Sequence, residues 1–184
     1  MAALPLSAPR DHFLLSPSYA GNEPLSEVKA ADGKSVVNPA FGRSVWYDAF
    51  QDPIDASRHG FDIHIYYPDY DESETDPSKL HPKTVHALAL RERIRREFPE
   101  LRCYRAWPKP VGPHPTAMFE LNVFTPEQLG AIIPFLLANR GDLSVLLHPN
   151  THDEIKDHTD FAVWFGHPVV LNIDLLLEPS AKRD

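Results

Sequence analysis

The chain has 184 residues, enough for one domain with a substantial core, and its formal net charge of -8 argues against a nucleic-acid partner. No apolar run approaches the length of a membrane span, and the single cysteine, Cys103, cannot form an intramolecular disulfide. Because the N-terminus also lacks the pattern of a secretory signal, these features predict a cytoplasmic protein with no membrane partner.

The N-terminal third of the sequence has little regular pattern. Residues 1–58 carry scattered serine, proline, alanine and glycine, and their hydrophobic periodicity is weak. This composition predicts an extended N-terminal arm, in which residues 44–47 pack on the main body as a short strand. The sequence shows neither a repeat nor a second domain, so residues 59–184 are expected to form one domain.

A clear alternation of apolar and polar residues begins at Phe61. The segment FDIHIYYP predicts a half-buried strand, with Ile63 and Ile65 facing one side. His64 and Tyr66 then face the opposite side.

The rest of the chain alternates between helical and strand patterns. In chain order we expect a helix at 78–98, strands at 101–107 and 117–124, a helix at 125–139 and a strand at 143–149. Thr125 is placed well to cap the second helix, with Pro126 at its first position. A polar loop is expected next, and then additional strands at 161–166 and 169–177.

This order of elements predicts a fold of the α+β class. Two β-α-β units joined by a hairpin form a ferredoxin-like split βαβ sandwich, with an antiparallel sheet in the order 4-1-3-2 and extra C-terminal strands. Both helices cover one face of the sheet. The other face must be covered by the arm, the C-terminal segment or a second copy of the chain, and we expect a homodimer.

Three side chains from adjacent strands are expected on the open face. His64, Glu120 and His148 share the parity that points away from the helices, and neighbouring strands lie about 4.8 Å apart. Two histidines and a carboxylate with open positions are the ligand set of non-haem Fe(II) oxygenases. Each histidine alone is as well explained by a solvated or hydrogen-bonded side chain. Together the three predict a metal site, with Fe(II) as the expected ion and Zn(II) as the alternative in isolated protein.

Two further histidines are candidate catalytic residues. His114 lies in GPHPT, where the flanking prolines stiffen the backbone, so it could be a metal ligand, a general acid/base or a surface loop residue. His158 lies in KDHTD, where Asp157 or Asp160 could orient its ring, although an exposed helix-start residue explains the pattern too. His59 is expected only to occupy a turn.

Several residues are candidates for substrate binding. Tyr66 and Tyr104 could stack on a planar ring, and Arg102 or Arg105 could pair with a substrate carboxylate. Ordinary packing or surface charge accounts for each of them equally well.

The segments FDIHIYY, VGPHPTAMFELNVFTPEQ and LLHPNTHDEIKDHTDFAVWFG, with residues 168–177, resemble the DOPA 4,5-dioxygenase family. The resemblance covers about residues 61–177 and implies a ferredoxin-like fold, an oligomer and extradiol cleavage of catechols such as DOPA. Carried over by motif, it implies functional roles for His64, His114, Glu120, His148 and His158. One departure is His152, which stands where the family usually has glycine and could narrow the pocket, alter the substrate or add a ligand.

The sequence therefore predicts an extradiol-type dioxygenase that acts on catechols with a non-haem metal and O2. One alternative is a non-catalytic dimeric protein of ferredoxin-like fold that binds a metal or an aromatic ligand. Another is a cofactorless monooxygenase built on the same sheet. Metal analysis separates the three, because iron supports the first, zinc alone the second and no metal the third.

Overall fold

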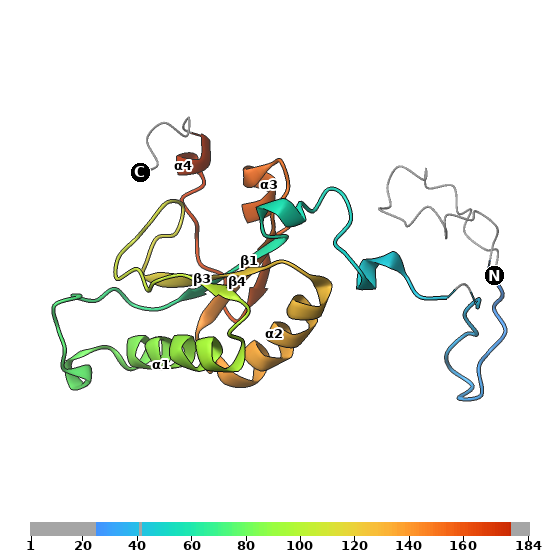
Figure 1. Ribbon diagram of the computed structural model, residues 1–184, viewed down its shortest axis with the longest axis horizontal. Coiled ribbons are helices and arrows are strands. Elements are labelled where there is room, and N and C mark those ends of the chain that lie inside the picture. The colour runs from blue at the N-terminus through green and yellow to red at the C-terminus, as the bar shows by residue number, and fades with distance from the viewer. Residues whose placement is uncertain (1–24, 41, 178–184) are drawn as a thin grey trace.

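A computed structural model describes residues 25–40 and 42–177 of the chain and shows an α+β fold (Figure 1). Its sheet has five strands, all antiparallel, in the order β2-β3-β1-β4-β5. The predicted order 4-1-3-2 is confirmed, and the fifth strand extends the sheet beside β4. The strands are β1 (Phe61–Tyr66), β2 (Arg102–Cys103), β3 (Met118–Val123), β4 (Ser144–Pro149) and β5 (Val163–Phe165).

The helices lie on both sides of this sheet. In chain order they are α1 (Pro82–Glu97), α2 (Pro126–Asn139), α3 (Glu154–His158) and α4 (Asp174–Leu177), with short 3-10 turns η3 (Val45–Tyr47), η4 (Ala56–Arg58) and η5 (Pro77–Lys79). Figure 1 shows α1 and α2 on one face, as predicted, and the short α3 and α4 on the other. Residues 25–40 of the arm run away from the sheet in Figure 1, whereas η3 lies beside α2 and Phe50 packs on Phe61 of β1.

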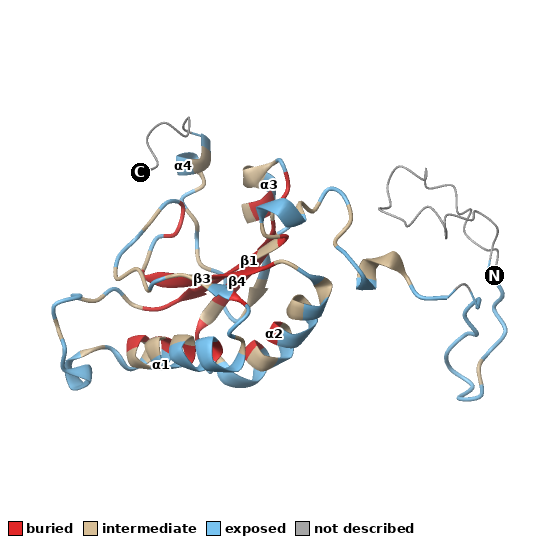
Figure 2. Ribbon diagram, in the orientation of Figure 1, coloured by how far each residue is buried: buried red, intermediate tan, exposed pale blue. Residues whose placement is uncertain are grey.

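The main core lies between the sheet and the two long helices. Ile63 and Ile65 of β1 are fully buried there, with Ala87 of α1 and Ile132 of α2. Burying such apolar side chains stabilises the fold by roughly 1.5–3 kcal/mol each. Figure 2 shows the buried residues concentrated in the central strands and on the inner faces of α1 and α2. The alternation in the sequence therefore predicted the core face of β1 correctly.

The helix boundaries follow from their first residues. The Thr125 hydroxyl accepts a hydrogen bond from the Gln128 backbone N–H, and Pro126 begins α2, as predicted. Helix α1 begins at Pro82 rather than at residue 78, because a proline holds the residue before it in an extended conformation. His81 has a ψ of 138° and caps the helix by accepting from the Lys83 N–H.

The expected strand at 101–107 is regular only at Arg102–Cys103, and the rest of that prediction is wrong. Tyr104 N–H donates to the Glu120 carbonyl, but the next ladder bond joins Trp107 N–H to the Met118 carbonyl. The segment from Tyr104 to Trp107 therefore has one residue more than the segment of β3 that it faces. The extra residue interrupts the hydrogen-bond ladder, as in a β-bulge.

Three other local predictions also differ from the structure. Residues 44–47 lie against the main body beside α2, as predicted, but they form the 3-10 turn η3 instead of a strand, because the Ser44 hydroxyl caps the turn at the Trp46 N–H. The polar loop after β4 contains α3, which the Asp153 carboxylate caps. Residues 169–177 form no strand, because Asn172 N–H bonds to the Pro113 carbonyl and leads the chain across the open face into α4.

The open face has a small apolar cluster of its own. Met118 and Leu146 are 2% and 0% exposed, and Trp164, Val169 and Leu171 pack on them. Of the three covers expected for this face, the structure shows the C-terminal segment, because Trp164, Val169 and Leu171 of the same chain pack there. The homodimer itself stays a prediction. None of the helices in residues 25–40 and 42–177 combines the length and apolar character that a membrane span needs.

Candidate metal and catalytic site

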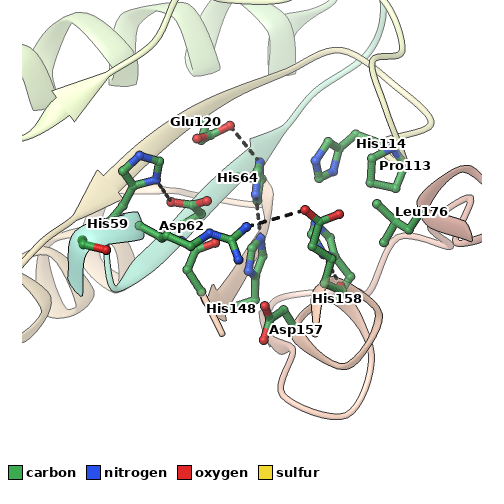
Figure 3. A pocket seen from close by; sticks show the side chains of 14 residues that line it. His59, Asp62, His64, Pro113, His114, Glu120, His148, Asp157, His158 and Leu176 are labelled. Atoms are coloured by element: carbon green, nitrogen blue, oxygen red, sulfur yellow. Dashed lines mark hydrogen bonds and ion pairs between the residues drawn. The ribbon is translucent and has the colours of Figure 1, made fainter. Parts of the chain in front are cut away.

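A cavity of about 480 Å³ opens beside the apolar cluster on the face of the sheet opposite α1 and α2 (Figure 3). This volume is within the usual range for a small-molecule site. Its walls come from the end of the arm, from β1, β3 and β4, from the loop before β3 and from α3 and α4.

Four histidines from four separate segments meet in this cavity. His64 is on β1, His148 on β4, His114 in the loop before β3, and His158 at the end of α3. The Nε2 atoms of His64 and His148 are 3.0 Å apart. The ring centroids of His64 and His114 are 4.2 Å apart, and those of His148 and His158 are 4.1 Å apart. The structure thus brings the four histidines that were expected to be metal ligands or catalytic residues into one cluster, whereas His152 lies outside it.

Burial keeps these imidazoles neutral. It lowers the pKa of His64 well below the usual value, and the neighbouring histidines lower that pKa further. The same causes lower the pKa of His114 to about 3 and that of His158 to about 4. Burial also lowers the pKa of His148. Neutral imidazole is the form that binds metal ions.

Backbone and hydroxyl groups fix the ring orientations. His148 Nδ1 donates to the Pro149 carbonyl at 2.8 Å, and His158 Nδ1 donates to the Glu154 carbonyl at 2.9 Å. In a neutral ring, each Nε2 then carries a lone pair. His114 Nδ1 lies 2.7 Å from the Tyr66 hydroxyl. Contacts of this kind usually orient metal-binding histidines.

His64 has no arrangement of protons that satisfies both of its ring nitrogens. If Nε2 donates to His148, then Nδ1 is left buried without a hydrogen-bond partner. If Nδ1 carries the proton instead, the lone pairs of His64 and His148 face each other at 3.0 Å. A cation between them removes this conflict, since two nitrogens about 2.1 Å from one ion at right angles lie about 3.0 Å apart.

Two carboxylates lie at the strand side of the cavity. Asn122 Nδ2 donates to Asp62 at 2.6 Å and to Glu120 at 2.7 Å. Burial and the nearby Asp62 raise the pKa of Glu120 to about 7, and burial raises the pKa of Asp62. Glu120 Oε2 lies 3.9 Å from His64 Nδ1, and Figure 3 shows His64 between Glu120 and His148.

Two sets of three described residues bring their ligand atoms within 4.8 Å of one another. One set is His64, His114 and His158, and the other is Asp62, His64 and His148. His64 belongs to both sets, whereas Glu120 belongs to neither. The expected trio of His64, Glu120 and His148 therefore shares one cavity without forming one such set.

Most of the residues expected to orient His158 or to bind substrate have other partners in the structure. Asp157 accepts from the Thr151 N–H and hydroxyl, so it ties the loop together instead of orienting His158. Tyr66 reaches the site through its bond to His114. The other three candidates do not line the cavity: Arg102 donates to His59, Tyr104 lies against Trp107, and His152 borders a separate hollow beside residues 50–57.

Sequence reasoning missed several groups that line the cavity, among them Asp62, Arg58 and His59. Asp62 lies two residues before His64 on the same strand face, so its parity was enough to identify it. Arg58 and His59 gave no comparable signal, because the path of the arm decides where they lie. His59 Nδ1 is 3.4 Å from Asp62, and its Nε2 accepts from Arg102 at 3.0 Å.

Comparisons with known proteins place the sequence in one family. Residues 61–175 match the model of the Dopa 4,5-dioxygenase family. The chain is 47% identical over 167 residues to an uncharacterized 21.2 kDa protein of Botryotinia fuckeliana, with 86% of each chain covered. It is 30% identical over 128 residues to the DOPA 4,5-dioxygenase of Amanita muscaria, a match that covers 67% of this chain and 52% of that protein.

A solved structure shares the fold. The crystal structure of a candidate dioxygenase from Nostoc punctiforme superposes with a TM-score of 0.54 at 32% identity. The match covers 64% of this chain and 90% of that one.

Proposed function

The chain belongs to the Dopa 4,5-dioxygenase family, as its motifs predicted, and we propose that it cleaves catechols such as DOPA by extradiol-type ring opening with O2. The cofactor in this proposal is one non-haem Fe(II) ion. The observation that carries the proposal is the cluster of four histidines around His64, in which the Nε2 atoms of His64 and His148 face each other at 3.0 Å and can both direct a lone pair at one cation.

The residues of the cavity fit a metal ion of this kind. We propose His64 and His148 as two of its ligands, since their Nε2 atoms face each other at 3.0 Å. His158, whose ligand nitrogen lies within 4.8 Å of that of His64, is the proposed third ligand. A bound Fe(II) ion would supply a redox-active centre through which electrons pass from the catechol to O2.

The remaining polar groups of the cavity handle protons in this proposal. His114 is neutral and faces the cluster, with its Nδ1 held by Tyr66, so it can take a proton from a catechol hydroxyl. A catecholate beside it raises its basicity, because a negative charge favours the protonated imidazole. In this proposal Glu120, with a pKa of about 7, donates and accepts protons at the strand side of the site and does not bind the metal.

The decisive experiment is anaerobic reconstitution with Fe(II), followed by a panel of catechols in the presence of O2. We expect about one ion per chain, and O2 uptake together with a ring-opened product for at least one catechol. If no catechol supports O2 uptake by iron-loaded protein, the proposed activity is wrong.

Metal analysis of single variants tests the ligand assignment separately. We expect His64→Ala, His148→Ala and His158→Ala to lose most of the metal, and Glu120→Gln and His114→Phe to retain it. Full metal content in His64→Ala would contradict the site itself. Loss of metal from Glu120→Gln would instead restore the ligand set expected from the sequence.

A further inference from the structure

Arg58 places a positive charge in the wall of the cavity. Among the described residues that line it, Arg58 is the only arginine or lysine, whereas four are aspartate or glutamate. A guanidinium in this wall can bind a planar anion such as a carboxylate, because its N–H donors form a fork that matches the two oxygens. Neither Arg102 nor Arg105, the arginines that the sequence favoured for a substrate carboxylate, lines the cavity.

The backbone around Arg58 is held in place by the end of β4. Asp55 begins η4, and its N–H donates to the Asn150 carbonyl at 2.8 Å. Asn150 N–H donates in turn to the Gly60 carbonyl at 2.8 Å. The Arg58 side chain is fixed as well, because its Nη1 donates to the Thr151 carbonyl at 2.8 Å. The guanidinium is therefore oriented before any ligand binds, which lowers the entropy cost of binding.

The contact of Arg58 with Glu154 leaves donor capacity available. Arg58 Nη2 is 3.6 Å from Glu154 Oε1, beyond good hydrogen-bond distance, and both side chains are 43% exposed. Exposed ion pairs of this kind contribute little. A carboxylate on a ligand offers better geometry, since it accepts two parallel N–H bonds from one guanidinium.

We propose that Arg58 is a specificity-determining residue that binds a carboxylate on the side chain of the catechol. The inference rests on the proposed ring-cleaving function and deepens it, since it names the residue that selects catechols with an anionic side chain over neutral ones. The catechol ring faces the histidine cluster, and the side chain extends toward η4. The end of the arm is thus part of the substrate site.

Anaerobic binding measurements test this assignment without turnover. The iron-loaded full chain is titrated with 3,4-dihydroxyphenylpropionate, which is anionic, and with 4-methylcatechol, which is neutral. We expect wild type to bind the acid more tightly. Arg58→Gln should weaken binding of the acid by roughly 10- to 100-fold, at least tenfold more than any change for 4-methylcatechol.

Three further variants separate recognition from folding. Arg58→Lys keeps the charge but not the fork, and should restore only part of the affinity for the acid. Glu154→Gln removes a negative neighbour and should strengthen binding of the acid, an effect that a folding defect cannot produce. Arg93→Gln on α1, which pairs with Glu97 outside the cavity, is the matched control for loss of one positive charge.

Each outcome has a clear meaning. If Arg58→Gln weakens both ligands equally, or leaves binding of the acid intact, the assignment of Arg58 is wrong while the catechol function stands. The same holds if wild type does not prefer the acid. If wild type binds neither ligand, the proposed catechol function fails and the role of Arg58 fails with it.

Discussion

His64 is the residue on which the site depends, because it is in contact with partners on both sides. It lies opposite Glu120 on β3 and Leu146 on β4, so the register of the central strands sets its position. Strand parity in the sequence was enough to place His64, Glu120 and His148 on one face. Parity could not show that Glu120 lies outside the sets of closely spaced ligand atoms, since side-chain reach depends on the exact packing.

His114 carries the first prediction. His114→Phe should retain metal and still bind catechol, but should lose roughly a hundred- to ten-thousand-fold in turnover, because proton transfer is removed. Tyr66→Phe, which removes only the hydroxyl at His114 Nδ1, should have a smaller effect. The check is single-turnover kinetics with iron-loaded protein alongside metal analysis. Normal turnover in His114→Phe would leave Glu120 as the proton-transfer residue to examine.

The lowered pKa values of the histidines predict how metal-free protein responds to acid. In the unfolded chain these side chains take up protons near pH 6.5, whereas folded His158 and His114 resist protonation down to about pH 4 and 3. Their contribution to stability is therefore present above pH 6.5 and is lost as the pH falls toward 4. The raised pKa of Glu120 has the opposite sign, since it favours the folded state at low pH and loses that effect as the pH rises through 7.

We accordingly expect the melting temperature of metal-free protein to fall between pH 7 and pH 5. His114→Phe should show a smaller fall, because one buried imidazole no longer has to stay neutral. Thermal denaturation in the presence of a chelator measures both. An equal pH dependence in the two proteins would contradict the burial of a neutral His114.

At the scale of elements, the hydrophobic pattern of the sequence predicted the helices and strands that have a regular period. It missed the segments whose path is set by single backbone hydrogen bonds. The two long helices and the central strands follow from repeats of 3.6 and 2 residues. The bulge after Cys103 and the path of residues 169–177 do not, because single hydrogen bonds to Glu120 and Pro113 determine them. The division at residue 58 stays a prediction, although Arg58 and His59 line the same cavity as the domain's histidines.

The junction between η4 and β1 gives a prediction about stability. Gly60 has a φ of 70°, and a Cβ there would lie 2.5 Å from the Phe50 ring and 2.9 Å from the Val123 carbonyl. Gly60→Ala should therefore lower the free energy of unfolding by about 1–3 kcal/mol. Gly130→Ala in α2, where a Cβ meets nothing within 4 Å, should raise it by about 0.5–1 kcal/mol. Urea denaturation measures both, and an unchanged Gly60→Ala would contradict the close approach of Phe50.

At the scale of the whole molecule, the edge of the sheet at β5 now supplies the reason to expect a dimer. Val163 on this strand is 49% exposed and Val170 nearby is 89% exposed. Exposed apolar edge strands tend to pair with another chain. We expect light scattering to give the mass of a homodimer, and Val163→Lys to shift it toward the monomer. A monomer at every concentration in the wild-type chain would contradict the dimer.

The four histidines come from positions spread over nearly a hundred residues of sequence, and this spacing determines when the site can exist. While the chain is being synthesised, His64 emerges before its partners His114, His148 and His158, so the cluster is complete only after α3 has left the ribosome. Domains fold as units, so the ion-binding pocket closes only when the whole sheet is assembled. A nascent or truncated chain that ends before α3 lacks His158 and β5 and therefore cannot form the complete cluster. Under the proposed function, loading with metal accordingly follows synthesis and reports that folding is complete.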